Sequence, residues 1–324
     1  MKKGKLKRDL WRLRNDLQEV AQLDRLAKRD ILMFFLIIAS FLLGFLMHNL
    51  LLQNRPSTVS KQAVPINSPT PDKLAIIQKK VMKDSYSIPL RWGDLGERLL
   101  RDGVIDKQKL AKAVVGADTL PEDLDTYFTG GQDSIEVTQQ NAQFWVDVFW
   151  GLGLANRNSL LTSGPMVEGS RTANFASTGG YTIGARQPME IYAKSSYIPL
   201  SEVQQKEVEE IAGSIYRPCC GNSTAFPDCN HGMAALGLVE LMVSQNFTKE
   251  EIYKTVLAFN TYWFPGTYLD VAYYFQQNGR DYSKVPAKEL LSKTFSSAMG
   301  YQVIHKKVGN LPWPALQSGG SCGA

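Results

Sequence analysis

The chain has 324 residues, of which 44% are hydrophobic and 21% charged, proportions typical of a globular protein with a real core. Ten of its 36 Lys and Arg residues precede residue 31, alongside only five Asp and Glu, so the remainder carries 26 residues of each sign. A neutral body lacks the basic face that nucleic-acid binding requires, and this excludes nucleic acid as the expected partner.

Residues 1–30 are predicted to form a basic amphipathic segment on the cytoplasmic side. Apolar side chains recur at alternating spacings of four and three, at Leu6, Leu10, Leu13, Leu17 and Val20. Such a stripe is typical of a helix that lies on anionic lipid headgroups. The alternative is a short coiled coil through residues 6–29, which would allow self-association or contact with other membrane or envelope proteins.

The segment from Ile31 to Leu52 contains no Asp, Glu, Lys or Arg. A bilayer core of ~30 Å needs roughly 20 helical residues, so this segment is predicted to span the lipid bilayer. The basic residues concentrated before it predict a cytoplasmic N-terminus. No small-x-small cleavage site follows, which favours a signal-anchor over a cleaved signal peptide. The expected localisation is therefore the cell membrane, single-pass, with an extracytoplasmic C-terminal domain.

Residues 53–73 combine Pro, Ser, Thr and Asn and are expected to be a linker. The domain that follows, 74–324, is predicted to be mainly α. Gly103 is expected to stop one helix, and Asp106 to cap the next helix through Val115. From Ser134 to Leu154 the aromatic residues follow near-helical spacing, which predicts a helix in the core.

Residues 159–187 are rich in Gly, Ser and Thr and show no helical period, so a long, ordered and irregular insertion is expected there. No second linker follows, which favours one domain. Cap and proline signals predict further helices from Ser201 to about Ile215, after His231, from Thr248, and from Pro286 to about Met299.

All four cysteines, Cys219, Cys220, Cys229 and Cys322, fall in the last third of the chain, on the side predicted to be oxidising. An even count is compatible with two disulfides, and a bridge from Cys219 or Cys220 to Cys229 would close a short loop. The adjacent pair is not expected to bond to itself, because that geometry is strained. Under this interpretation the chain is a structural or assembly protein without an enzymatic role.

A second interpretation is a metal site with the pattern Cys-Cys-x8-Cys-x-His. Thiolate and imidazole are the ligands that zinc, copper and iron, including haem iron, accept in proteins. The sequence therefore predicts metal ligands at Cys219, Cys220, Cys229 and His231, with Cys322 as a further sulfur.

A third interpretation is thiol chemistry, because Cys229 and His231 stand where a helix is expected to begin. A helix N-terminus and a nearby imidazolium both stabilise a thiolate. No Asp or Asn is evident to orient a Cys-His pair, so no catalytic residue is assigned and an enzyme is not favoured.

Residues 216–265 resemble the small helical thiol-oxidoreductase domain of bacterial cytochrome c maturation proteins. The resemblance rests on Tyr216-Arg217-Pro218-Cys219-Cys220 before a helix and on Asn246-Phe247-Thr248-Lys249-Glu250-Glu251-Ile252 as the turn into a second one. That family carries Cys-x-x-Cys, which this chain replaces with two adjacent cysteines and the more distant Cys229. The resemblance implies thiol or haem-related chemistry near a membrane.

Together these patterns predict a membrane-anchored extracytoplasmic protein whose Cys/His cluster binds a metal. A thiol-disulfide redox protein and a disulfide-stabilised assembly protein are the alternatives. The sequence alone does not choose among them.

Overall fold

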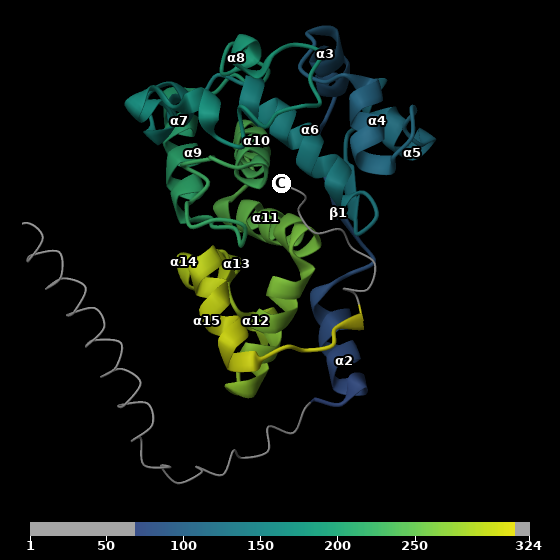
Figure 1. Ribbon diagram of the computed structural model, residues 1–324, viewed down its shortest axis with the longest axis vertical. Helices are drawn as coiled ribbons and strands as arrows, with labels where there is room; N and C mark the ends of the chain where they lie inside the picture. The colour runs from purple at the N-terminus through teal and green to yellow at the C-terminus, as the bar shows by residue number, and fades with distance from the viewer. Residues whose placement is uncertain (1–68, 315–324) are drawn as a thin grey trace, which may run out of the picture. The chain divides into compact units, whose positions relative to one another are not determined.

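The computed structural model describes residues 69–314 (Figure 1). The predicted cytoplasmic segment 1–30, the predicted span Ile31–Leu52, most of the predicted linker and Cys322 lie outside these residues. Between residues 69 and 314 no helix is both long and apolar enough to cross a bilayer. The longest helices there have 15 residues, against the roughly 20 that a span needs. This finding corrects the single-pass fold class and the cell-membrane localisation that the sequence predicts.

The described part of the chain is mainly helical, with one small sheet. The α-helices, in chain order, are α2 (Pro71–Val81), α3 (Leu95–Arg101), α4 (Lys107–Val115), α5 (Glu122–Asp125), α6 (Ala142–Ala155), α7 (Ser159–Thr162), α8 (Pro188–Ile191), α9 (Glu202–Ser214), α10 (Asn230–Ser244), α11 (Lys249–Trp263), α12 (Pro265–Gln277), α13 (Ala287–Leu290), α14 (Lys293–Ser296) and α15 (Ala298–Val308). Short 3-10 helices are η1 (Thr126–Phe128), η2 (Pro165–Ser170), η3 (Thr172–Asn174) and η4 (Tyr282–Lys284), and the strands are β1 (Ser85–Ile88) and β2 (Ile135–Thr138).

At the centre of the largest core, α6 packs against α10 (Figure 1). Both helices are buried on nearly every face, as expected for helices that are apolar all round. Two glycines allow the close approach. A Cβ on Gly153 would lie 2.3 Å from the carbonyl oxygen of Met233, and one on Gly237 would lie 2.7 Å from that of Phe149. The contact fixes α10, whose first turn carries the cysteine site described below.

A buried carboxylate ties α10 to the chain that leaves α6. The Glu240 side chain is completely buried, and its oxygens accept hydrogen bonds from Asn156 Nδ2 at 2.8 Å and Asn158 Nδ2 at 2.6 Å. Burial raises the pKa of Glu240 to about 8, although the two amide donors oppose that shift. Ionisation of this carboxyl as the pH rises therefore couples core stability to pH.

The two strands pair antiparallel, with Ile88 opposite Ile135. In β2, the side chains of Ile135 and Val137 are buried while Glu136 is exposed, which is the alternation of a strand with one face on the core. The helix predicted over 134–154 therefore begins later, at Ala142. The partner strand lies about fifty residues earlier, a non-local pairing that the local spacing of aromatics does not reveal.

Local capping signals are placed as the sequence predicts. The Asp106 side chain accepts from the backbone N–H groups of Gln108 and Lys109 and caps α4, which ends at Val115. Both Ser201 and Thr248 form reciprocal capping boxes.

The helix predicted from Pro286 to Met299 is wrong in its extent. The chain instead forms three helices, α13, α14 and α15, broken at Ser292 and Ser297, which both adopt extended backbone angles. The Ser297 hydroxyl accepts from Gly300 N and starts α15. A serine that caps one helix here also ends the preceding one.

The insertion 159–187 is less irregular than predicted, because it contains α7, η2 and η3. It is held to the core by Trp150, whose indole N–H donates to the carbonyl of Ser177 at 2.7 Å. The backbone N–H of Ser177 in turn donates to the carbonyl of Asp228 at 3.1 Å. The insertion thus supports the loop before α10.

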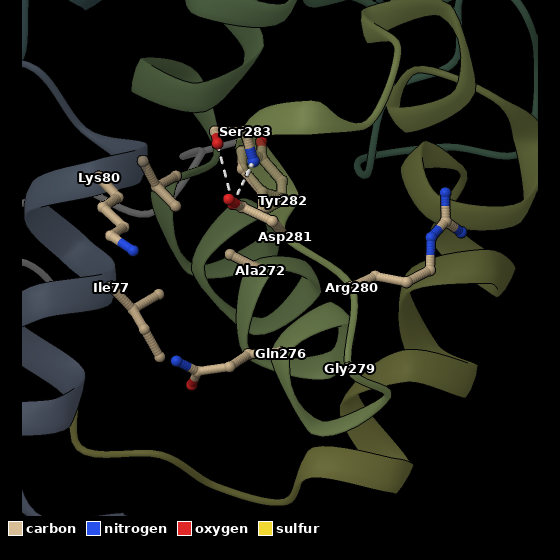
Figure 2. Close-up of a pocket in the computed structure, with 10 residues that line it drawn as sticks. Ile77, Lys80, Ala272, Gln276, Gly279, Arg280, Asp281, Tyr282 and Ser283 are labelled. Atoms are coloured by element: carbon tan, nitrogen blue, oxygen red, sulfur yellow. Dashed lines mark hydrogen bonds between the residues drawn. The ribbon is translucent and has the colours of Figure 1, made fainter.

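Helices α2, α12 and α15 form a second packed region, where α12 contacts both of the others. A pocket of about 300 Å³ opens between α2 and α12, where Lys80 and Gln276 extend from facing helices (Figure 2). Within it, Asp281 accepts from the backbone and hydroxyl of Ser283, and Arg280 points away to pair with Glu289 at 2.9 Å. None of the residues that line this pocket is a predicted ligand.

Candidate metal centre

The cysteine site is built on the loop that joins α9 to α10. Two backbone hydrogen bonds hold the first part of this loop: Tyr216 N donates to Leu291 O at 2.8 Å, and Thr224 N donates to Ile215 O at 2.8 Å. The carbonyl of Cys220 accepts from Ala298 N, the first residue of α15, at 2.9 Å. The loop is therefore anchored to three separate elements before it reaches Cys229.

Three thiols meet in this loop. The sulfur atoms of Cys219, Cys220 and Cys229 all lie within 4.8 Å of one another, close enough to hold a metal ion. The sulfurs of Cys219 and Cys229 approach to 3.4 Å. Cys219 is exposed to solvent, whereas Cys220 and Cys229 are partly buried, and all three are free thiols. The cluster thus has one open side and two protected ligands.

Cys229 occupies the N-cap position of α10. Its sulfur accepts from the backbone N–H of Gly232 at 3.4 Å, a role that Ser, Thr, Asp or Asn usually fills. It also accepts from Nε of Arg217 at 3.0 Å. A helix N-terminus and a guanidinium both favour negative charge on the sulfur.

Arg217 is the organising side chain of the loop. Its side chain is 1% exposed, and its guanidinium also donates to the carbonyls of Asn222 and Phe226 and to Asp228 Oδ1 at 2.8 Å. Gly232 makes room for it, because a Cβ there would lie 2.3 Å from Arg217 Cζ. A buried guanidinium with this many acceptors holds both the loop and the sulfur in place.

The polar support extends to Asp228. Its second oxygen, Oδ2, accepts from Asn222 Nδ2 at 2.7 Å, and Oδ1 lies 3.8 Å from the sulfur of Cys220. Arg217 and Asp228 carry opposite charges. They therefore offset one another, and the thiolates account for the remaining charge of the site.

The three thiols do not share charge equally. Hydrogen bonds from Cys219 and Cys220, together with the Arg217 charge, hold the pKa of Cys229 well below its ordinary value, against the opposing effect of burial. The pKa of Cys219 is raised, because its thiol hydrogen-bonds to the sulfurs of Cys220 and Cys229. For Cys220, the hydrogen bond with Cys219 lowers the pKa, but the interaction with Cys229 and burial outweigh it and raise the pKa to about 11. Cys229 is thus the thiolate of the group.

Of the five predicted ligands, the structure brings together Cys219, Cys220 and Cys229. His231 is not in this group of ligand atoms. Its ring is buried against Phe264 and Trp263, with ring centroids 4.5 and 5.5 Å apart, and burial lowers its pKa to about 4. The fifth, Cys322, lies outside the described residues.

Arg217, Asp228 and Asn222 were not predicted to build the site. Their roles depend on how the loop folds back on itself, which spacing along the chain does not reveal. The one local signal was Arg217 directly before Pro218 and the cysteine pair, because a basic residue next to cysteines favours thiolate.

We compared the chain with family models, curated proteins and solved structures, and none matches. No comparison bears on the resemblance of residues 216–265 to thiol oxidoreductases, which stays a prediction.

Proposed function

We propose that the protein binds a single thiophilic metal ion through Cys219, Cys220 and Cys229. The observation that carries the proposal is the convergence of three thiol sulfurs within 4.8 Å on an anchored loop. The buried Arg217 guanidinium donates to the sulfur of Cys229 and favours its thiolate, the form of cysteine that binds metal. Sulfur is the donor that zinc and copper(I) prefer.

The spacing favours one ion over a larger cofactor. Around a tetrahedral zinc with Zn–S bonds of ~2.3 Å, neighbouring sulfurs stand ~3.8 Å apart. The observed separations, 3.4 Å for the sulfurs of Cys219 and Cys229 and no more than 4.8 Å within the group, bracket that value. Small movements of the exposed Cys219 side chain suffice to reach it.

A fourth sulfur is available from Cys322. Trp313 is fixed in a buried position, with its indole N–H donating to Asp270 Oδ1 at 2.7 Å. Nine residue steps separate Trp313 from Cys322 and allow a reach of up to ~30 Å. Helix α15, which begins beside Cys220 and runs 11 residues, is only ~16 Å long. We propose Cys322 as the fourth sulfur when the bound ion is zinc, and Cys322→Ser tests this role.

His231 is left out of the proposed ligand set. Its ring packs against Phe264 and Trp263, and its nitrogens are not among the ligand atoms that gather within 4.8 Å of one another. With three thiolates alone the site suits copper(I), and with Cys322 added it suits zinc.

Anaerobic metal titration of the full-length chain tests the proposal. We expect one ion per chain. Cys219→Ser, Cys220→Ser and Cys229→Ser should each lower affinity at least ~100-fold, because even second-shell changes cost 10–100-fold. Ser223→Ala, in the same loop but without a thiol, is the matched control and should bind normally. Cys322→Ser should weaken zinc more than copper(I). Unchanged affinity in all three single-cysteine variants would refute the proposal.

A further inference from the structure

We propose that Cys219 and Cys229 form a reversible disulfide that switches the metal site off. This inference rests on the proposed function, since it describes how that same site would be regulated. It assigns a specific pair among the three cysteines and leaves Cys220 as the spectator thiol.

The pairing follows from the positions of the sulfurs. Cys219 and Cys229 approach to 3.4 Å and need to close to ~2.05 Å to bond. The sulfur of Cys220 also lies near two polar oxygens, 3.8 Å from Asp228 Oδ1 and 3.9 Å from the carbonyl oxygen of Asn222. A bond between the adjacent residues Cys219 and Cys220 would be strained. We therefore assign the bridge to Cys219 and Cys229, the pair that combines a 3.4 Å approach of the sulfurs with a solvent-exposed partner.

The surroundings let this pair react without unfolding. Cys219 is exposed, so a soluble reagent reaches it directly. Cys229 is held at the start of α10 by Gly232 N–H and the Arg217 guanidinium. One partner is thus accessible and the other fixed, so the required movement falls on the loop residue and leaves α10 in place.

The chemistry balances with a low-molecular-weight disulfide, such as oxidised glutathione, as the oxidant. The two cysteine sulfurs lose two electrons and form one S–S bond. The S–S bond of the reagent breaks, and it leaves as two reduced thiols that take up the two protons or carry the charge as thiolates. No further co-reactant is needed.

Oxidation removes two ligands at once. Metals bind thiolate, and a disulfide sulfur carries no negative charge, so only Cys220 of the three would still coordinate. Because linkage is reciprocal, a bound ion must also protect the pair against oxidation. The site would then hold its ion under reducing conditions and release it under oxidising ones.

The experiment exposes the zinc-loaded full-length chain to oxidised glutathione and follows zinc release with a chromogenic chelator. Digestion that cuts before Asp228 separates Cys229 from Cys219 and Cys220, so mass spectrometry of alkylated peptides identifies the bridge. We expect a cross-link between the two fragments, zinc release in step with it, and formation at least about tenfold faster in the metal-free chain. Cys220→Ser should keep the cross-link, and Cys219→Ser should lose it.

The outcomes separate this inference from the proposed function. A chain that binds zinc but forms no cross-link overturns the assigned pair. The same conclusion follows if the cross-link persists in Cys219→Ser and is lost in Cys220→Ser. A chain that forms the cross-link but binds neither zinc nor copper(I) overturns the metal proposal, and with it the switch, while leaving the pair intact. Zinc retained after complete cross-linking overturns the switch alone.

Discussion

Replacing Glu240 with Gln is expected to flatten the dependence of folding stability on pH. Glu240 is fully buried, and burial raises its pKa from 4.5 to about 8 even though Asn156 and Asn158 donate to both of its oxygens. A folded pKa above the unfolded value means that the folded chain holds the proton more tightly. The stability that this group contributes is therefore complete below about pH 4.5 and is lost as pH rises to about 8.

The size of the effect follows from the same shift. Each pH unit within that interval costs up to ~1.4 kcal/mol, so raising the pH from about 5 to about 7 costs up to ~3 kcal/mol. Gln carries no titrating proton and removes this slope. One of its amide N–H groups would face an asparagine donor, which costs ~1–3 kcal/mol relative to the protonated Glu240 at low pH. The test is therefore the slope of the unfolding free energy against pH, and not the absolute stability of the variant.

Urea unfolding at several pH values between about 5 and 8, in metal-free buffer with a reductant, measures that slope. The exposed Glu168→Gln in η2 is the matched control and should keep the parent's pH dependence. Asp147, whose pKa burial raises to about 7, contributes in the same direction, but its effect cancels when parent and variant are compared. Identical slopes for the parent chain and Glu240→Gln would refute the reasoning.

Three further predictions concern the core and the site. Gly237→Ala should destabilise the fold by about 1–3 kcal/mol because its Cβ would meet the α6 backbone, whereas Gly213→Ala in α9, with nothing within 4 Å, should stabilise it by up to ~1 kcal/mol. Thermal unfolding compares the two, and equal shifts would contradict the close helix contact. Arg217→Met leaves Asp228 without its ion pair and should lower the free energy of unfolding in urea by about 3 kcal/mol. A decrease under ~1 kcal/mol, as expected for a surface residue, would contradict the organising role of Arg217. Zinc at about 100 times Kd should raise the free energy of unfolding by ~2.7 kcal/mol, and a chelator should reverse the gain; no change in Tm would argue against binding.

Features that depend on a few neighbouring residues could be predicted from the sequence. Asp106 and Thr248 cap helices because the side chain and the N–H groups it accepts from lie within three residues. The β1–β2 pairing was missed because it joins segments about fifty residues apart. Ser297 was missed because its capping role divides what spacing alone reads as one helix.

The site also combines features that depend on neighbouring residues with features that depend on the folded chain. The three cysteines could be predicted to gather because two are adjacent and the third follows within ten residues. His231 was added because it lies two residues after Cys229, but side chains two apart at a helix start diverge, and its ring turns to Phe264. Arg217 acts through the folded loop, which the sequence does not specify. No helix between residues 69 and 314 exceeds 15 residues or could cross a bilayer, and the predicted span Ile31–Leu52 lies outside these residues.

Metal content and free-thiol number of the full-length chain, purified without oxygen, test the central claim most directly. The account predicts one zinc or copper ion per chain, with the thiols of Cys219, Cys220 and Cys229 protected from alkylation until the ion is removed. A chain without metal whose thiols are all freely reactive, or already paired in disulfides under reducing conditions, would contradict it.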